Sequence, residues 1–214
     1  DTAFEEVLVA LCAYHDNCWL LPEYCGLLRS LHRRGPVPVD TALSGGRAQF
    51  QVHSVELVDE NGELAAGEIG YAIGSVFTSL TGFTREGYPS AGKVQLVGLA
   101  CVLEACGATL WNLGHPPREA SERLPASMLY KRDIGVTVLP RREFLRRWLD
   151  ARDRDLIAFP RHTAVTPAEK RGSDGEADSK EGGPRALGER TSVRELIDAR
   201  KARLREQDEE LRQS

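Results

Sequence analysis

A β-strand pattern of apolar and polar residues runs through the middle of the chain. Residues 50–58 alternate apolar and polar side chains, which predicts a half-buried strand. The segment 59–62 (DENG) contains an Asn-Gly pair, which accepts the positive φ values of a tight hairpin. A return strand is predicted over 64–73, and Gly74 introduces a third strand that passes through Leu80. The three strands are expected to form an antiparallel meander.

A helical spacing of apolar residues follows the meander. Ser90 is placed to cap a helix over 90–106, and Gly107 suits the first position after its end. A short buried strand is predicted over 109–113. The order strand, strand, strand, helix, strand seats a ligand at the N-terminus of the helix.

Two further helices precede the meander. Thr2-x-x-Glu5 fits a capping box, and the helix that it opens is expected to run to about Tyr14. Pro22 suits the first turn of a second helix, which ends before Gly35. The apolar face predicted for this second helix consists of Tyr24, Leu27, Leu28 and Leu31.

The segments after the meander predict smaller elements. A helix is expected over about 119–130, a strand over 136–139, and a helix that begins at Pro140. The apolar arc of this last helix, expected to pack on the sheet with the arginines outward, consists of Phe144, Leu145, Trp148 and Leu149. The basic face is interpreted as solvated, with contact to an RNA backbone as the alternative.

Composition divides the chain, because nearly all large apolar residues lie before Phe159. We therefore expect a folded domain over 1–158, a disordered linker over 159–191 and a charged, solvated helix over 192–214, with partner binding by that helix as the alternative. The chain begins with Asp1, which suggests a fragment or a processed product with any targeting signal upstream.

Net charge and cysteine content exclude several classes of protein. The net charge is −4 and the pI about 5.8, so no overall basic surface for nucleic acid exists, although local basic clusters remain. The five cysteines include no Cys-x-x-Cys pair, which disfavours a disulfide framework or a zinc site. They are interpreted as small buried residues in a reducing compartment. No apolar run approaches the ~20 residues that span a bilayer.

The segment 87–93 has the spacing of a phosphate-binding loop, G-x-x-x-x-G-K. Val94 follows where such a loop needs Ser or Thr, and the next strand ends in Asn112 instead of an aspartate. Both residues, together with the antiparallel meander, disfavour an NTPase. A helix after such a meander also suits an acyltransferase of the acetyltransferase superfamily, in which an activated acyl group lies between two strands.

Three stretches carry a resemblance to a known family. HSVELVDENGELAAGEIGYAIGSVFTSLTGF, SAGKVQLVGLACVLEACGATLWNLG and YKRDIGVTVLPRREFLRRW resemble the leucyl/phenylalanyl-tRNA–protein transferases, in one continuous order over about 3–150. The resemblance implies an α+β fold of the acetyltransferase (GNAT) type, with a largely antiparallel sheet flanked by helices. It also implies that the family's small N-terminal domain is missing from this chain.

The resemblance implies a reaction as well. Enzymes of this family move Leu or Phe from tRNA to the N-terminal Arg or Lys of a protein, by attack of the amine on the aminoacyl ester, and so mark the protein for degradation. The implied partners are aminoacyl-tRNA and such proteins in the cytoplasm. No metal, small-molecule cofactor or membrane is implied.

Residues of the site are carried over position by position. Trp19 matches a tryptophan that packs near the terminal adenosine and the acceptor. The pocket for the apolar side chain of the aminoacyl group corresponds to Ser79, Leu80, Gly82, Leu99, Leu103 and Trp111. The alternative interpretation is that Leu99, Leu103 and Trp111 are core residues.

The chain departs from the family pattern at two places. Ser79-Leu80-Thr81 stands where the bacterial pattern has Gly-Glu-Ser, so a pocket carboxylate is missing. Asn112 and Gly114 stand at the catalytic positions, where the family has an aspartate and a glutamine. A positioned general base contributes ~10²–10⁴ in rate. A slower enzyme is therefore expected, and the alternatives are an inactive homologue that binds tRNA or N-terminal degrons, or an acetyl-coenzyme A-dependent acetyltransferase.

Phosphate contacts to the tRNA acceptor end require local positive charge. The residues expected to supply it are Arg33, Arg34, Lys131, Arg132, Arg142 and Arg146.

Overall fold

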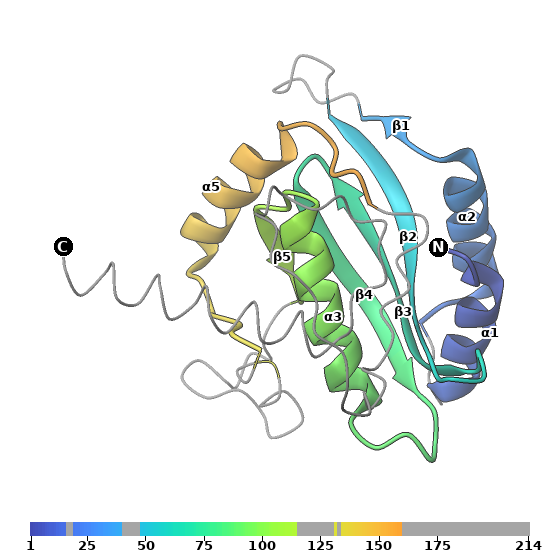
Figure 1. Ribbon diagram of the computed structural model, residues 1–214. Helices are drawn as coiled ribbons and strands as arrows, with labels where there is room; N and C mark the ends of the chain where they lie inside the picture. The colour runs from blue at the N-terminus through green and yellow to red at the C-terminus, as the bar shows by residue number, and fades with distance from the viewer. Residues whose placement is uncertain (16–18, 40–47, 115–130, 132–133, 160–214) are drawn as a thin grey trace, which may run out of the picture. The chain divides into compact units, whose positions relative to one another are not determined.

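A five-stranded sheet with helices on both faces organises the protein (Figure 1). The computed structural model describes residues 1–15, 19–39, 48–114, 131 and 134–159. The helices are α1 (Phe4–Tyr14), α2 (Pro22–Arg34), α3 (Ala91–Ala105) and α5 (Arg141–Arg152). The strands are β1 (Val37–Pro38), β2 (Gln49–Val58), β3 (Leu64–Ile73), β4 (Val76–Thr84) and β5 (Leu110–Asn112), in the spatial order β1-β2-β3-β4-β5. Asp1–Phe159 form one unit by their contacts.

The predicted antiparallel meander is confirmed. Strand β2 pairs antiparallel with β3, and β3 pairs antiparallel with β4. The turn between β2 and β3 is closed by the bond from the Asp59 N–H to the Glu63 carbonyl, at 2.9 Å. Gly62 has a φ of +84° and Asn61 does not have a positive φ, so only one residue of the Asn-Gly pair uses the left-handed region.

The turn between β3 and β4 has only Gly74 and Ser75 between the paired residues Ile73 and Val76. Gly74 takes a φ of +54°, as the first residue of a type II′ hairpin requires. A Cβ at this position would lie 2.2 Å from the carbonyl oxygen of Arg152, at the end of α5. The turn therefore docks directly against backbone and leaves no room for a side chain.

Replacing Gly74 by alanine is expected to lower the free energy of unfolding by about 2 kcal/mol, because strain at a positive φ adds to a steric clash. Urea titration of the variant and the wild type measures this change. Gly87→Ala is the matched control, since Gly87 also has a positive φ (+88°) but its Cβ would meet nothing within 4 Å. Equal losses in the two variants would contradict the docking of the turn on α5.

A β-bulge interrupts the pairing of β3 and β4. Gly70 pairs with Ser79 and Ile69 pairs with Thr81, so Leu80 is an extra residue on β4. An extra residue shifts the alternation of side chains by one position. Phe77, before the bulge, packs with Leu99 and Leu103 of α3, whereas Phe83, after it, belongs to the cluster formed with α1.

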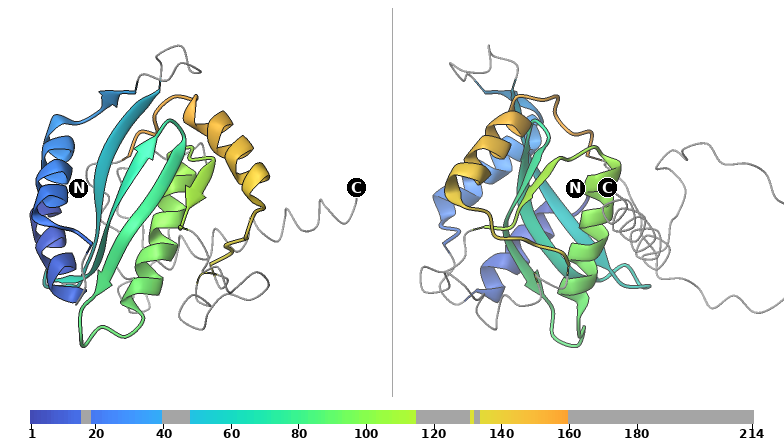
Figure 2. Two further views of the ribbon diagram at one scale, coloured as in Figure 1. Left: turned by 180° about the vertical axis from the view of Figure 1, so that it is seen from behind. Right: turned by 90° about the vertical axis from the view of Figure 1, so that its left-hand side faces the viewer.

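Helix α3 covers one face of the sheet and ends as predicted (Figure 2). Gly107 has a φ of +77°, its N–H donates to the Glu104 carbonyl, and the Ala108 N–H donates to the Leu103 carbonyl, which together make a Schellman motif. Ser90 occupies the N-cap position but has a φ of +68° and makes no side-chain cap. The expectation that Ser90 caps this helix is therefore wrong.

Helices α1 and α2 lie on the opposite face (Figure 1). Helix α1 begins after Ala3 with no side-chain cap, so the predicted Thr2-x-x-Glu5 capping box does not form. Pro22 opens α2 as expected. The predicted apolar face of α2 is wrong in part, because Tyr24 and Leu27 are half exposed while Cys25 and Leu28 are buried against α1.

Helix α5 follows Pro140 as predicted and continues to Arg152. Of the predicted apolar arc, Phe144 and Trp148 are half-buried, but Leu145 and Leu149 are exposed, since the helix packs on the ends of β4 and β5 by one edge. The strand expected over 136–139 is not formed.

Other expectations concern residues outside this description. The predicted helix over 119–130, the linker over 159–191 and the charged helix over 192–214 lie wholly or almost wholly there, as does Cys18. Cys25 and Cys101 are buried as expected, whereas Cys12 is exposed and was predicted wrongly. No helix in the described ranges combines the length and the apolar character needed to cross a bilayer.

Candidate active site

Glu68 is a carboxylic acid in the middle of an apolar strand. It lies on β3, is 4% exposed and pairs in register with Gly82 of β4. Its neighbours on β3 are small or apolar, and a Cβ on Gly82 would lie 3.4 Å from the Cβ of Glu68. A buried carboxyl group is unfavourable unless it is hydrogen-bonded, so its partners define the site.

A directed chain of hydrogen bonds leads from β5 to this carboxyl group. The Trp111 Nε1–H donates to Ser79 Oγ at 3.0 Å, and Ser79 Oγ lies 2.7 Å from Glu68 Oε1. The indole N–H can only donate, so Ser79 accepts from it and gives its own proton to Glu68. Ser79 and Trp111 are both half-buried, which places the start of the chain at the surface and its end in the interior.

Lys131 is a described residue whose charge acts on Glu68. Its Nζ donates to the Leu113 carbonyl at 2.8 Å, and its positive charge favours the ionised form of Glu68. Burial outweighs this attraction and the Ser79 hydrogen bond, and raises the pKa of Glu68 to about 7. Burial also lowers the pKa of Lys131. A carboxyl group poised near neutrality can accept or donate a proton at working pH.

Among the described residues, the edge of β4 beside this chain has a strand partner only over its first three residues. Strands β4 and β5 are parallel and pair only over Val76–Thr78 and Leu110–Asn112, after which β4 continues for six residues to Thr84. The bulge residue Leu80 lies on this edge and is 36% exposed. The seat for an acyl group between these two strands stays a prediction.

Asn112 is the last residue of β5 and pairs with Thr78. Its side-chain Oδ1 accepts the Gly114 N–H at 3.1 Å, and Gly114 has a φ of +89°. Successive residues of a strand point to opposite faces, so Asn112 faces away from the side of the sheet that Trp111 shares with α3. The two predicted catalytic positions are thus joined to each other but not to the Glu68 chain.

The other predicted pocket residues fall into two groups. Ser79, Leu80 and Gly82 lie in the part of β4 beyond its pairing with β5, and the Trp111 Nε1–H on β5 donates to Ser79 Oγ. Leu99 and Leu103 are each 2% exposed and form a cluster with Phe77, against which Trp111 packs. The alternative interpretation as core therefore holds for these two leucines.

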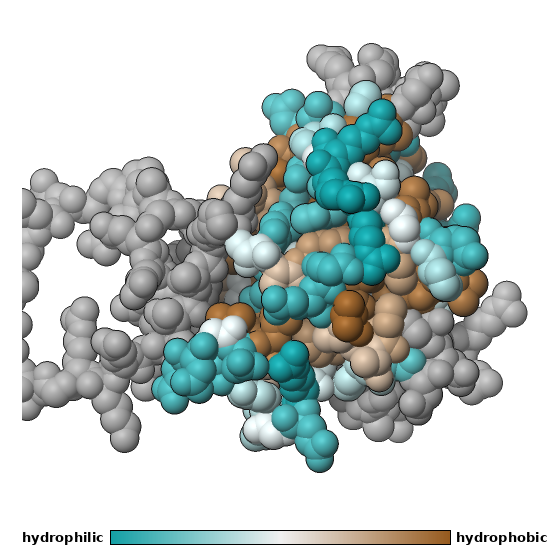
Figure 3. Space-filling model, turned by 90° about the vertical axis from the view of Figure 1, so that its right-hand side faces the viewer, coloured by the Kyte–Doolittle hydropathy of each residue, from teal (hydrophilic) through white to brown (hydrophobic). Residues whose placement is uncertain are grey.

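Trp19 lies on the α1–α2 side of the molecule. It is 47% exposed and makes an edge contact with Tyr24, with ring centroids 6.1 Å apart. His15, at the end of α1, bonds to Thr81 Oγ1 and to the Gly82 carbonyl, which ties this end of the helix to β4. Figure 3 shows apolar surface between polar groups on this face, where exposed apolar side chains on α1, on α2 and just before α2 include Val9, Leu21 and Leu27.

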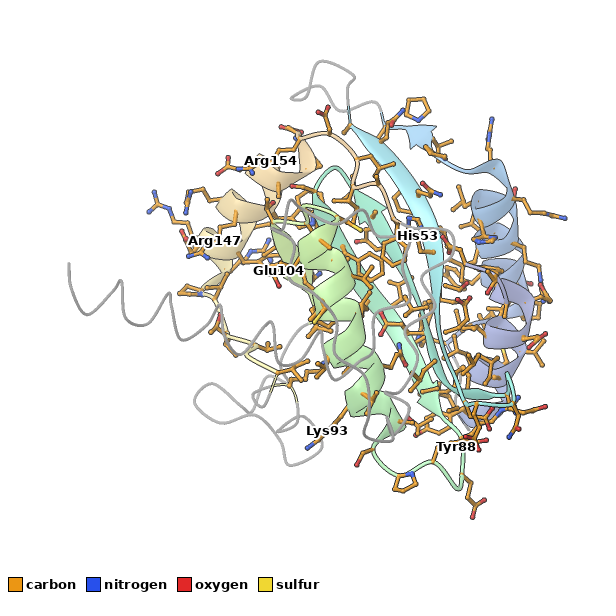
Figure 4. All side chains as sticks on the ribbon, in the orientation of Figure 1. His53, Tyr88, Lys93, Glu104, Arg147 and Arg154 are labelled. Carbon is orange, nitrogen blue, oxygen red and sulfur yellow. The ribbon has the colours of Figure 1, made fainter. Side chains whose placement is uncertain are left out.

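The predicted tRNA-binding cations are dispersed. Arg33 and Arg34 are exposed at the end of α2, and Arg142 is exposed on α5. Arg146 forms ion pairs with Glu143 and Asp150, and the neighbouring Arg147 points away from the sheet in Figure 4. Lys131 is partly buried, and Arg132 lies outside the described residues. Their contact with RNA stays a prediction.

A second buried titratable side chain, His53 of β2, lies in the sheet interior (Figure 4). Its Nδ1 is 2.7 Å from Asp1 Oδ2, and its ring lies 4.6 Å from that of Phe159. Burial lowers the pKa of His53 to about 4, so the ring is neutral near pH 7. His53 pairs with Gly70, which is two residues along β3 from Glu68.

Within the described ranges, no group of three His, Cys, Asp or Glu residues could hold a metal ion. A hollow of about 590 Å³ lies at the opposite ends of β4 and β5, lined by Ser75, Thr109 and 153–157 among others. None of the predicted pocket residues lines it, so the hydrogen-bond chain is the better guide to chemistry.

Comparison with known proteins identifies the family. The family model described as leucyl/phenylalanyl-tRNA protein transferase matches residues 1–148. The chain belongs to this transferase family. That match covers both helices of the α1–α2 face, the meander, α3 and β5.

Relatives that carry the same name, leucyl/phenylalanyl-tRNA–protein transferase, resemble the chain at about 30% identity. The protein of Rubrobacter xylanophilus is 31% identical over 151 residues, which are 71% of this chain and 64% of that protein. The protein of Nitrosomonas europaea is 31% identical over 155 residues, 69% of this chain and 57% of its own length. The protein of Dinoroseobacter shibae is 32% identical over 105 residues, 49% and 39% respectively. The chain thus spans less than two thirds of these leucyl/phenylalanyl-tRNA–protein transferases.

Sequence reasoning missed Glu68 in this member of the leucyl/phenylalanyl-tRNA protein transferase family. The available signal was one acidic residue inside LAAGEIGYAI, a strand that is otherwise apolar, aromatic or glycine. The residues carried over from the family resemblance did not include Glu68. Its partner Ser79 was identified, and the hydrogen bond between them now connects the two strands.

Proposed function

We propose that this protein is an aminoacyl-tRNA–protein transferase, which moves Leu or Phe from tRNA to the N-terminal Arg or Lys of a protein. The match of the family model to residues 1–148 carries this proposal. Because the acceptor amine attacks the aminoacyl ester of a charged tRNA, the proposed site of action is the cytoplasm.

The arrangement of strands supports this reaction. A meander, then α3, then a strand that pairs with β4 over only three positions is the order expected for an acyltransferase of the acetyltransferase type. The ester would lie between β4 and β5, with Asn112 on one side of the sheet and Ser79 on the other. Holding ester and amine together contributes up to ~7–11 kcal/mol in favourable cases, so positioning can carry most of the catalysis.

Free amine is available without a strong base. An α-amino group has a pKa of about 7.7–8, so an appreciable fraction is unprotonated near neutral pH. Asn112 can hold the amine or the ester carbonyl by hydrogen bonds, since its amide NH₂ donates and its Oδ1 already accepts from Gly114.

Transfer of radiolabelled leucine and phenylalanine from charged tRNA to a peptide with N-terminal Arg tests the proposal. The whole protein is used, with any segments that flank the present chain. Label is expected in the Arg peptide and in a Lys peptide, but not in an N-acetylated Arg peptide. Label no higher than in a reaction without enzyme, from folded protein, would refute the transferase activity.

A binding protein without turnover is the second candidate, and the amide at position 112 favours it. A neutral amide cannot take a proton from the amine at any working pH. This candidate predicts saturable binding of charged tRNA or Arg peptides, measured by fluorescence anisotropy, with no transfer of label.

A further inference from the structure

Two thiols from different helices meet on the α1–α2 face of the sheet. Cys12 Sγ of α1 lies 3.8 Å from Cys25 Sγ of α2, and the two helices lie next to each other (Figure 1). Cys12 is exposed, whereas Cys25 is buried. A disulfide bond is about 2.05 Å long, so the two sulfur atoms need to approach by about 1.8 Å to be joined. The pair thus has one thiol that a reagent in solution can reach and one that is shielded.

A positive charge lies beside both sulfur atoms. Arg29 follows Cys25 by one helical turn on α2, and its guanidinium donates to the carboxylate of Glu5 on α1. The Glu5 hydrogen bond raises the pKa of Arg29, and the charges of Cys25 and Cys12 contribute to the same shift. Because this interaction is mutual, the guanidinium favours the thiolate form of each cysteine. The thiolate is the form that attacks a disulfide.

The segment between the two thiols leads to the candidate active site. His15 follows Cys12 at the end of α1, and its Nε2 lies 3.1 Å from Thr81 Oγ1 and 3.2 Å from the Gly82 carbonyl oxygen. Gly82 is one of the residues predicted to form the pocket for the aminoacyl side chain. The His15 contact therefore joins the end of α1 to the part of β4 that carries the candidate site.

The two helices pack on different parts of the sheet. Helix α1 packs on β2, β3 and β4, whereas α2 packs mainly on β2. Strand β2 lies two positions away from β4 in the sheet, so drawing α1 toward α2 moves the end of α1 away from β4. A displacement of about 0.5 Å already takes contacts of 3.1 and 3.2 Å beyond the ~3.5 Å limit of a hydrogen bond.

We propose that Cys12 and Cys25 form a redox pair, whose oxidation joins α1 to α2 by a disulfide and releases His15 from β4. The oxidant is a small-molecule disulfide. The Cys12 thiolate attacks one of its sulfur atoms, forms a mixed disulfide and expels a first thiolate. Cys25 loses its proton to water, and its sulfur then attacks Cys12 Sγ and expels the second thiolate. The protein gives up two electrons and two protons, and the oxidant becomes two thiols.

Release of His15 lowers the rate of aminoacyl transfer, because the edge of the candidate site at Gly82 loses its contact with α1. The expected decrease is about 3- to 10-fold, the effect of one or two hydrogen bonds. This consequence rests on the proposed function, whereas formation of the disulfide does not.

Oxidation of the whole protein by glutathione disulfide tests the pair. After the remaining thiols are alkylated, peptide mapping by mass spectrometry is expected to find Cys12 joined to Cys25, and dithiothreitol should reverse the link. Cys12→Ser should abolish the cross-link. Cys106→Ser, which removes a half-buried thiol at the end of α3, should leave it unchanged. Absence of the Cys12–Cys25 peptide, or a link of either thiol to Cys18 instead, would overturn the inference.

Two further measurements follow His15 in the reduced and the oxidised protein. The NMR signals of its ring, assigned by comparison with His15→Ala, should shift on oxidation. The transfer rate should fall on oxidation in the wild type but not in Cys12→Ser or His15→Ala. Unchanged ring signals, or equal transfer rates, in the cross-linked wild type would overturn the release of His15. Reduced protein that transfers no label would instead refute the proposed function, since the peptide map and the NMR signals are measured without turnover.

Discussion

Replacing Asn112 by aspartate is expected to raise the rate of aminoacyl transfer about 10²-fold at pH 7. A positioned general base contributes ~10²–10⁴, and the low end applies because part of the α-amine is already unprotonated. The site can accept this change, since Asn112 Oδ1 takes a hydrogen bond from the Gly114 N–H at 3.1 Å and a carboxylate oxygen can take the same bond. The second carboxylate oxygen is then available for the proton of the attacking amine.

Single-turnover transfer of radiolabel measures this gain over a range of pH. The aspartate variant should show an additional loss of rate on the acidic side, where the new carboxylate becomes protonated. Asn112→Ala is the matched control and should be slower than the wild type. It removes the bond from the Gly114 N–H to Asn112 Oδ1 and the proposed bond from the Asn112 amide to the substrate. A folded aspartate variant with an unchanged rate would show that position 112 does not act in proton transfer.

The contribution of Glu68 to the stability of the protein should decrease as the pH rises, in contrast to the usual behaviour of a carboxyl group. Burial raises the pKa of Glu68 from 4.5 to about 7, so the folded protein keeps a proton that the unfolded chain releases above pH 4.5. The stability that this group contributes is complete below pH 4.5 and is lost as the pH rises through 7. A shift of this size corresponds to about 3 kcal/mol.

Glu68→Gln is the variant that isolates this effect. The difference in unfolding free energy between the variant and the wild type should increase in favour of glutamine by about 3 kcal/mol from pH 4.5 to pH 8. Urea titrations at several pH values measure it. A constant difference would mean that Glu68 titrates normally.

His53 acts in the opposite sense over nearly the same range. Burial lowers its pKa from 6.5 to about 4, so its contribution is present above pH 6.5 and is lost as the pH falls through 4. The two slopes oppose each other between pH 4.5 and 6.5, and the wild type should show little net dependence from this pair. In the Glu68→Gln variant, the unfolding free energy should therefore increase with pH between pH 4.5 and 6.5.

The elements with strong local signals were predicted well from sequence. The Asn-Gly turn, the bounds of β3, Pro22 at the start of α2 and Gly107 after α3 each have a cause within a few residues. The family membership was also predicted correctly, because it rests on the order of residues along most of the chain.

Predictions that depended on long-range packing were weaker. Helical spacing placed Tyr24 and Leu27 on the inner face of α2, but Cys25 and Leu28 are the residues that pack in the cluster with α1. Serine is a residue type that often caps helices, but Ser90 has a positive φ and its side chain forms no cap. The hydrogen bond from Ser79 on β4 to Glu68 on β3 depends on the pairing of the two strands, and no spacing along the sequence indicates it.

The bulge at Leu80 has a consequence for how this strand can evolve. Odd-numbered residues face α3 before it and α1 after it, as Phe77 and Phe83 show. One strand therefore contributes to two separate surfaces. Substitutions near Ser79 would change the candidate site, whereas substitutions near Phe83 would change the packing of α1 on the sheet. Deletion of a single residue here would exchange the two sets. Insertions and deletions in β4 should therefore be tolerated less well in related proteins than substitutions in β4.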